Sequence, residues 1–184
     1  MNPLDKEITF FKYFRDRFWL YVFNCTPNHK SFDGLRQKLL LLIGFQIKGS
    51  VKVFSPIEIT PKTNPKNIYL EGFVFINSGA RFSVPDGGKV EIYSDTLVGP
   101  NSSFETVNHG LLYKAGQPRG AIIGNIKINK GVWIGANVLI LQKVIINEGV
   151  VVAAASVVNK SIESYNLVGG IPAKILKKLN EEEK

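Results

Sequence analysis

His109 is the side chain in this sequence best suited to acid–base chemistry, and it is one of two histidines. It ends the stretch TVNH at 106–109, directly before a polar segment at 110–121. A histidine can take a proton from a hydroxyl or an amine near neutral pH, which makes His109 a candidate general base. His29 lies in a connector rich in Pro and Asn, and we interpret it as a surface residue.

Other reactive groups are scarce in the sequence. The single cysteine, Cys25, cannot form an internal disulfide and lies far from any Cys-His-Asn signature, so we interpret it as unreactive. Neither of the Gly-rich phosphate loops, GxxxxGK followed by Ser or Thr and GxGxxG, occurs. Two histidines and one cysteine are too few for the usual zinc clusters, and we therefore expect no metal requirement.

The segment from Ile122 to Ile162 repeats every six residues, and this period predicts the scaffold that must position His109. Neither a helical period of about 3.6 residues nor two-residue alternation repeats at six, whereas short strands wound into a solenoid do. Gly and Asn recur where such a chain must turn. We therefore predict a parallel β-helix whose hexads are led by Ile122, Ile128, Ile134, Ile140, Ile146, Val152 and Val158.

The same register extends backwards through three more leading residues, Ile92, Val98 and Phe104. Residues 110–121 have the length of two hexads, so the hexads on either side of them stay in phase. They lack the aliphatic pattern, however, and we therefore expect a loop extruded from the solenoid. A single histidine is more often a plain surface residue, but the place of His109 between coil and loop favours a catalytic role. Further upstream we expect residues 64–67 to hold a change of register.

Two amphipathic helices are predicted before the solenoid, the second ending at Gly44. Their apolar faces are expected to comprise Phe11, Phe14, Phe18 and Val22 in the first helix and Leu35, Leu39, Leu42 and Ile43 in the second. We favour the interpretation that both helices cap the open end of the solenoid, whose unpaired strand edge would otherwise aggregate. The alternative is that the aromatic and basic first helix rests on a membrane surface.

A second cap is expected at the other terminus. Gly169 and Gly170 suit a sharp departure from the solenoid, and Pro172 suits the first position of a short helix. The predicted organisation is a helical cap at 1–46, a β-helix at 47–167 with the extruded loop 110–121, and a helical cap at 168–184.

Composition restricts the class of protein and partner. A chain of 184 residues with 45% hydrophobic and 21% charged residues is typical of one soluble domain. No apolar run reaches the length of about 20 residues that spans a bilayer, and the first residues lack the pattern of a signal peptide, so we expect a cytoplasmic protein. The net charge of +8 suits an anionic partner, but the basic residues are dispersed without a nucleic-acid motif. We expect a phosphorylated ligand rather than nucleic acid.

The hexads, together with VWIGAN at 132–137, VVAAASVV at 151–158 and GGIPAKILKK at 169–178, resemble the hexapeptide-repeat acyltransferases. The resemblance is closest to the maltose, galactoside and nodulation-factor O-acetyltransferases and to related exopolysaccharide acetyltransferases, and it covers residues 68–178. It implies a left-handed β-helix, although the usual crossover rule favours the opposite hand. It also implies a homotrimer with acetyl-CoA bound between adjacent solenoids.

The resemblance assigns roles by position. His109 matches the family's catalytic base, Asn77 matches an asparagine that contacts the acceptor, and Asp86 matches an acceptor-binding aspartate if the insertion in 83–89 is placed to suit. The implied cofactor-binding residues are Ala136, Ala154, Asn159, Lys160, Lys174 and Lys177. Backbone groups at the two alanines would bond the pantetheine arm, and the lysines at 174 and 177 would face the nucleotide phosphates. Trp133 either walls the cofactor channel or packs at a trimer contact.

We therefore expect an acetyl-CoA-dependent O-acetyltransferase that acts on a hydroxyl of a sugar or polysaccharide precursor, with His109 as general base. No counterpart of the sugar enzymes' N-terminal domain is visible, which does not favour maltose or a β-galactoside as acceptor. Serine O-acetyltransferase and nucleotide-sugar N-acetyltransferase remain alternatives, because they use similar solenoids. A catalytically inactive β-helix scaffold is the non-enzyme alternative. A γ-type carbonic anhydrase would need three histidine ligands and is disfavoured.

Overall fold

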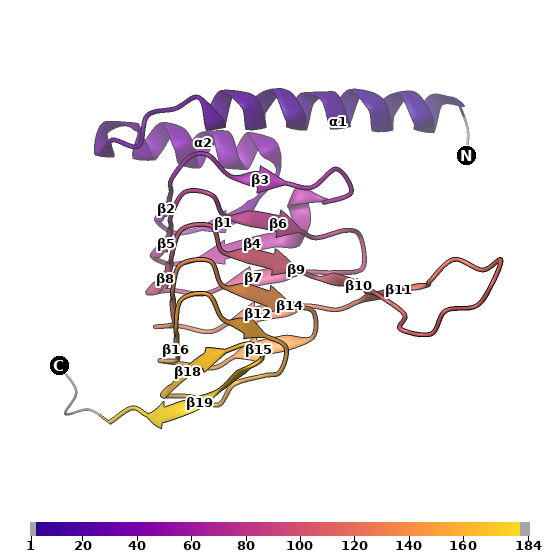
Figure 1. The fold of residues 1–184 in the computed structure, drawn as a ribbon. Helices are drawn as coiled ribbons and strands as arrows, with labels where there is room; N and C mark the ends of the chain where they lie inside the picture. The colour runs from indigo at the N-terminus through magenta and orange to yellow at the C-terminus, as the bar shows by residue number, and fades with distance from the viewer. Residues whose placement is uncertain (1–2, 181–184) are drawn as a thin grey trace.

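The computed structural model describes residues 3–180, with side chains from residue 13 onward. Its main body is a stack of coils made of short strands, and two helices close one end of the stack (Figure 1). Each coil contributes one strand to each of three sheets. The predicted β-solenoid with two N-terminal helices is confirmed, and its handedness stays a prediction.

The three sheets run along the stack, and their strands are parallel except for the last pair. Sheet A comprises β1 (Gln46–Lys48), β4 (Ile68–Glu71), β7 (Val90–Ile92), β12 (Ile126–Ile128) and β15 (Val144–Ile146). Sheet B comprises β2 (Val51–Val53), β5 (Val74–Ile76), β8 (Thr96–Val98), β13 (Trp133–Ile134), β16 (Val151–Val152), β18 (Asn166–Gly170) and β19 (Ala173–Lys178). Sheet C comprises β3 (Glu58–Ile59), β6 (Arg81–Ser83), β9 (Ser103–Glu105), β14 (Leu139–Leu141) and β17 (Val157–Val158).

The six-residue period reflects one strand and its turn on each face of the coil, with the same positions of each strand filling the core. Two side chains that are two residues apart point inward, and the residue between them points outward, as in Ile126 and Ile128 of β12. The leading residues from Ile128 to Val158 are at most 1% exposed. Ile122 is the exception among the predicted leading residues, because it lies outside the coils in β11 and is 40% exposed.

The change of register occupies a short 3-10 helix, η2 (Pro65–Asn67). The side chain of Asn64 caps it by accepting a hydrogen bond from the backbone N–H of Lys66. The expected irregularity at 64–67 is therefore present, and it precedes the first strand of the second coil, β4.

The N-terminal cap comprises α1 (Pro3–Asn24), the 3-10 helix η1 (Lys30–Phe32) and α2 (Asp33–Ile43). α1 packs through Trp19, Leu20, Val22 and Phe23, of which Phe23 is fully buried. The predicted apolar face of α1 is wrong for Phe14 and Phe18, which are 66% and 51% exposed. Phe11 lies outside the residues whose side chains are described.

Hydrogen bonds from two polar side chains of α1 explain why Phe14 and Phe18 face solvent rather than the solenoid. The guanidinium of Arg17 donates hydrogen bonds to the carbonyls of Ile59 and Thr60, the latter at 2.8 Å. The amide of Asn24 bonds both the carbonyl and the N–H of Ile57, at 3.0 and 2.9 Å. These bonds satisfy backbone groups of the first coil and fix which face of α1 meets the solenoid.

α2 shows a smaller difference from its predicted face. Leu39, Leu40 and Ile43 are buried as core residues. Leu35 and Leu42, which the pattern placed on the buried face, are instead 45% and 47% exposed.

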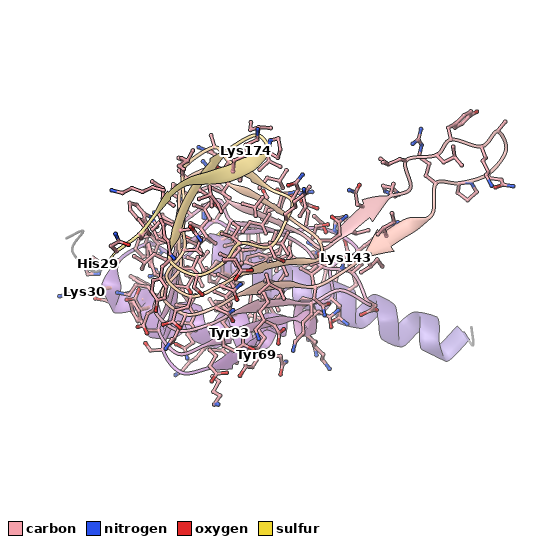
Figure 2. The ribbon with its side chains drawn as sticks, turned by 90° about the horizontal axis from the view of Figure 1, so that it is seen from below. His29, Lys30, Tyr69, Tyr93, Lys143 and Lys174 are labelled. Carbon is pink, nitrogen blue, oxygen red and sulfur yellow. The ribbon has the colours of Figure 1, made fainter. Side chains whose placement is uncertain are left out.

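The chain leaves the solenoid between the third and fourth coils as a projecting hairpin, which we call the arm. It consists of β10 (Val107–His109) and β11 (Ala121–Ile123), paired antiparallel, with residues 110–120 between them. The arm extends well beyond the stack, on the same side as the N-terminal half of α1 (Figures 1 and 2).

The predicted C-terminal helix is wrong for the residues that the structure describes. β18 and β19 form an antiparallel hairpin in which Gly169 pairs with Lys174 and Gly170 with Ala173. The outer edge of β18 would otherwise be unpaired at the end of sheet B, so strand pairing outweighs the local preference for a helix after Pro172. None of the helices between residues 3 and 180 has the length and apolar character needed to cross a bilayer.

Candidate active site

A groove of about 650 Å³ lies along the outer face of sheet B and the turns that follow it. One wall is a column of residues that are neighbours in register on successive strands, namely Phe75, Leu97, Trp133, Val151 and Leu167. The other edge is made of turn residues, among them Asn77, Gly99, Ala136 and Ala154. The structure therefore brings together three predicted site residues, Asn77, Ala136 and Ala154. Trp133, expected from the sequence to wall the cofactor channel or to pack at a trimer contact, lines the same groove.

The wall is unusual because it is apolar and faces solvent. Trp133 is 55% exposed and Leu97 is 44% exposed. A sheet face in contact with water is ordinarily polar. The column therefore indicates a surface that a ligand or another chain covers.

Sheet A provides the contrast. Its outward residues include Tyr69, which lies beside Tyr93 (Figure 2) with the two ring centroids 6.1 Å apart. They also include Lys127, whose ammonium lies 5.3 Å from the centroid of the Tyr93 ring. Tyr69 donates a hydrogen bond to Glu71, and this bond, together with burial, raises the pKa of Tyr69 to about 12. These polar contacts partner the outward residues of β4 and β12, although Ile145 of β15 is 44% exposed on the same face.

The turn edge of the groove presents two backbone donors. Ala136 and Ala154 are 18 residues apart, and they occupy equivalent turns of adjacent coils. The Ala155 N–H donates to the Ala136 carbonyl at 2.8 Å, and the Asn137 N–H donates to the Pro100 carbonyl at 2.8 Å. Within the described part of the chain, neither the Ala136 N–H nor the Ala154 N–H has an acceptor. Both donors are available to a ligand in the groove.

Glycines bring these turns close together. A Cβ atom on Gly135 would lie 2.6 Å from the Ala154 nitrogen, and one on Gly99 would lie 2.6 Å from the Gly135 carbonyl carbon. No side chain fits between the stacked turns, so the backbone itself forms this edge of the groove.

His109 lies elsewhere, at the end of β10 where the arm begins, and it lines a separate cavity of about 510 Å³. Its Nδ1 lies 3.4 Å from the carbonyl oxygen of Arg119 across the arm. A carbonyl oxygen can only accept, so Nδ1 is the donor in this contact. The Arg119 guanidinium donates hydrogen bonds to the carbonyls of Gly110 and Leu111 at 3.2 and 2.8 Å, which joins the two sides of the segment 110–120.

The cavity beside His109 has apolar and charged lining. Val107 and Ile123 come from the arm, and Lys62 and Arg81 come from the first two coils. Arg81 is paired with Glu58 at 3.1 Å and with Glu105, so its positive charge is balanced locally. This cavity shares no lining residue with the groove, and a single chain does not place His109 together with Ala136 and Ala154.

Asp86 is not among the residues that line the cavity of His109. Its carboxylate accepts hydrogen bonds from the side-chain amides of Asn64 and Asn67, at 2.7 and 3.4 Å. It lines a smaller cavity of about 160 Å³ that Tyr13 and Lys62 also line. In one chain Asp86 therefore stabilises the register change at 64–67.

The remaining predicted residues lie near the C-terminal end of the stack. Asn159 and Lys160 follow β17 and are exposed, and neither lines the groove. Lys174 (Figure 2) and Lys177 both lie on β19, and Lys177 pairs with Leu167 of the groove wall. The terminal hairpin therefore continues sheet B beyond the groove.

Several lining residues were not predicted from the sequence. Gly99 and Gly135 each follow a leading aliphatic residue directly, and this shared hexad position was a usable signal. Lys62 and Arg81 come from coils that precede the regular repeat, where the hexad register gives no position for a side chain.

Comparison with known proteins adds evidence from sequence and structure. No model of a known protein family matches the chain. A hexapeptide-repeat-containing acetyltransferase of Vibrio cholerae, solved in complex with acetyl coenzyme A, is 32% identical, with 92% of this chain and 88% of that chain covered and a TM-score of 0.80. A maltose O-acetyltransferase of Clostridium difficile is 27% identical over 90% of this chain and 85% of that chain, with a TM-score of 0.77.

A curated relative matches over a shorter length. The Escherichia coli protein WbbJ, whose name gives O-acetyl transfer in lipopolysaccharide biosynthesis as an inferred role, is 38% identical over 105 residues. That match covers 52% of this chain and 53% of WbbJ, so the chain spans about half the length of the curated relatives it matches.

The V. cholerae protein shares both the sequence and the coil stack over nearly its whole length. The hexad register, the three-sheet solenoid and this match agree with one another. The chain belongs to the hexapeptide-repeat acetyltransferase family.

Proposed function

We propose that this protein transfers an acetyl group from acetyl-CoA to a hydroxyl of a sugar-type acceptor, such as a precursor of a surface polysaccharide. The groove carries the proposal: an apolar wall faces two unpartnered backbone N–H groups, at Ala136 and Ala154, in a member of an acetyltransferase family. The V. cholerae relative was solved with acetyl coenzyme A, and the WbbJ name points to O-acetyl transfer, which favours a hydroxyl over an amine as acceptor.

The groove suits the pantetheine part of the donor. Pantetheine is a chain of amides joined by methylenes, so its carbonyls can accept from the Ala136 and Ala154 N–H groups while its methylenes lie against Leu97 and Trp133. Adjacent strands are about 4.8 Å apart, and this distance sets the spacing of the two N–H donors along the pantetheine chain of the cofactor. Beyond the groove, Lys174 and Lys177 are proposed to meet the nucleotide phosphates, with Asn159 and Lys160 at the next bend.

The proposed chemistry is a direct transfer. Nε2 of His109 takes the proton of the acceptor hydroxyl, and the hydroxyl oxygen attacks the thioester carbonyl carbon of acetyl-CoA. Backbone N–H groups beside the arm stabilise the tetrahedral oxyanion. The carbon–sulfur bond then breaks, and the leaving thiolate of CoA takes the proton from the imidazolium. Asn77 in the groove and Asp86 near Lys62 are proposed to orient the acceptor.

Assembly follows from the separation of the two cavities. His109 and the groove lie on different surfaces of one chain, and the exposed wall of sheet B needs a cover. A threefold arrangement in which each chain's His109 completes its neighbour's groove satisfies both requirements with one repeated interface. We propose a homotrimer with one acetyl-CoA between each pair of chains.

The activity is tested by thiol release from acetyl-CoA over a panel of sugars, amino sugars and serine. With the best acceptor, His109→Ala should lower kcat by about two to four orders of magnitude, because that is the usual contribution of a general base. His29→Ala is the matched control, because it removes the other histidine from an exposed connector in the cap. Equal turnover in His109→Ala and the parent would remove the proposed mechanism, and no thiol release with any acceptor would remove the proposed activity.

The phosphate contacts are tested by isothermal calorimetry with CoA and with free pantetheine. Lys174→Gln/Lys177→Gln should weaken CoA by about tenfold at low salt and leave pantetheine unchanged, because the lost attraction is electrostatic and local. Lys38→Gln/Lys66→Gln removes the same charge from exposed positions at the other end of the molecule and should leave both ligands unaffected. Equal weakening of CoA and pantetheine would mean that the lysines at 174 and 177 only hold the terminal hairpin in place.

The shared site is tested by mixing two inactive variants. His109→Ala lacks the base, and Ala154→Trp fills the groove, so neither homotrimer should turn over. Trimers refolded from a mixture of both contain sites that combine an intact His109 with an intact groove, and they should regain part of the activity. Sedimentation equilibrium should give three times the 20.4 kDa mass of one chain. A mixture that stays inactive, or an active monomer, would contradict the shared site.

A further inference from the structure

The outer face of α1 carries a row of exposed aromatic side chains. Phe14, Phe18 and Tyr21 are 66%, 51% and 69% exposed, and their spacing of four and three residues places them on one side of the helix. We call these three residues the outer stripe. Isolated apolar residues on a surface are ordinary, but an aligned row of large rings marks an interaction site.

The outer stripe cannot turn inward without breaking the contacts of the opposite face. That face packs Leu20 and Phe23 into the core, and it is held by the bonds of Arg17 to the first coil and of Asn24 to Ile57. Both kinds of contact fix the rotation of α1, so exposure of the outer stripe is a property of the folded protein.

The position of the stripe favours a flat partner. α1 lies across the end of the solenoid as the outermost layer of the molecule (Figure 1). α2 adds further apolar exposure to the same cap, since Leu35, Leu41 and Leu42 are 45–48% exposed. The cap therefore presents apolar side chains at one end of the molecule, away from the terminal hairpin at the other end.

The charge of the cap distinguishes between two partners for the outer stripe, a second copy of this chain and an anionic surface. Between residues 13 and 45 the cap holds five basic and two acidic residues, and Lys30 and Lys38 are exposed. The chain as a whole carries a net charge of +8. Two copies that met cap to cap would bring like charges together, whereas an anionic surface would attract both the local and the overall charge.

We propose that the cap docks on an anionic lipid surface, with the outer stripe entering the boundary between headgroups and acyl chains. Phenylalanine and tyrosine rings are well suited to this depth, and exposed lysines on the cap add attraction to anionic headgroups. This docking goes beyond acetyl transfer, and it does not depend on the proposed activity. The proposed contact is with the lipid surface, and residues 3–180 include no helix long and apolar enough to cross a bilayer.

The test is flotation with vesicles of phosphatidylcholine alone and of equimolar phosphatidylcholine and phosphatidylglycerol. The parent should bind the anionic vesicles in preference, and added salt should weaken that binding. Phe14→Ser/Phe18→Ser should bind the anionic vesicles about tenfold more weakly or worse, because two large apolar groups are lost. Phe73→Ser/Ile145→Ser removes side chains that are 47% and 44% exposed on the solenoid, and it should bind like the parent.

Thermal melting by circular dichroism establishes that both double variants are folded. Three results would overturn the proposal: no binding of the parent to anionic vesicles, equal binding by the parent and Phe14→Ser/Phe18→Ser, or equal loss in the Phe73→Ser/Ile145→Ser control. A fourth comes from sedimentation velocity without lipid. Association of the parent beyond the trimer that Phe14→Ser/Phe18→Ser abolishes would mean that a second copy covers the outer stripe.

Discussion

Parallel stacking of coils is the constraint on which the rest of the structure depends. Each strand bonds the strands one coil before and after it, so nearly all backbone donors within the sheets are consumed by the stack. Most turn donors are bonded as well, and at Gly99 and Gly135 the turns approach too closely for a side chain. The N–H groups of Ala136 and Ala154 are left without an acceptor within the described part of the chain, in turns that line the groove beside an apolar wall. The same stacking that forms the core therefore leaves two spaced donors for a ligand made of amides.

The hexads predicted the regular coils because, in this fold, a residue's place in the six-residue repeat determines whether its side chain points into the core. Ile128, Ile134 and Ile140 are buried where the period places them. Prediction failed where contacts distant in sequence decide the outcome. The Arg17 bonds to the first coil rotate α1, and pairing with β18 turns the expected terminal helix into a strand. Ile122 has the right period, but it pairs with Asn108 in the arm, and no local pattern distinguishes these two environments.

The sequence also predicted part of the candidate site, namely the residues whose places follow from the repeat. Ala136, Ala154 and Asn77 share the groove because the hexad phase places equivalent turns above one another. The role assigned to Asp86 depended on an alignment across the insertion in 83–89. In the structure its carboxylate accepts hydrogen bonds from Asn64 and Asn67. The place of His109 followed from the break in the repeat, whereas the contact of its Nδ1 with the Arg119 carbonyl across the arm is not encoded in sequence periodicity.

Site-resolved amide hydrogen exchange with and without CoA tests the central claim most directly. The account predicts that the Ala136 and Ala154 amides exchange fast in the free protein and slow when CoA binds, because the ligand supplies the missing acceptors. The Ala155 amide, already bonded to the Ala136 carbonyl, should be slow in both states. Protection by CoA elsewhere, with Ala136 and Ala154 unchanged, would contradict the assignment of the groove as the donor site.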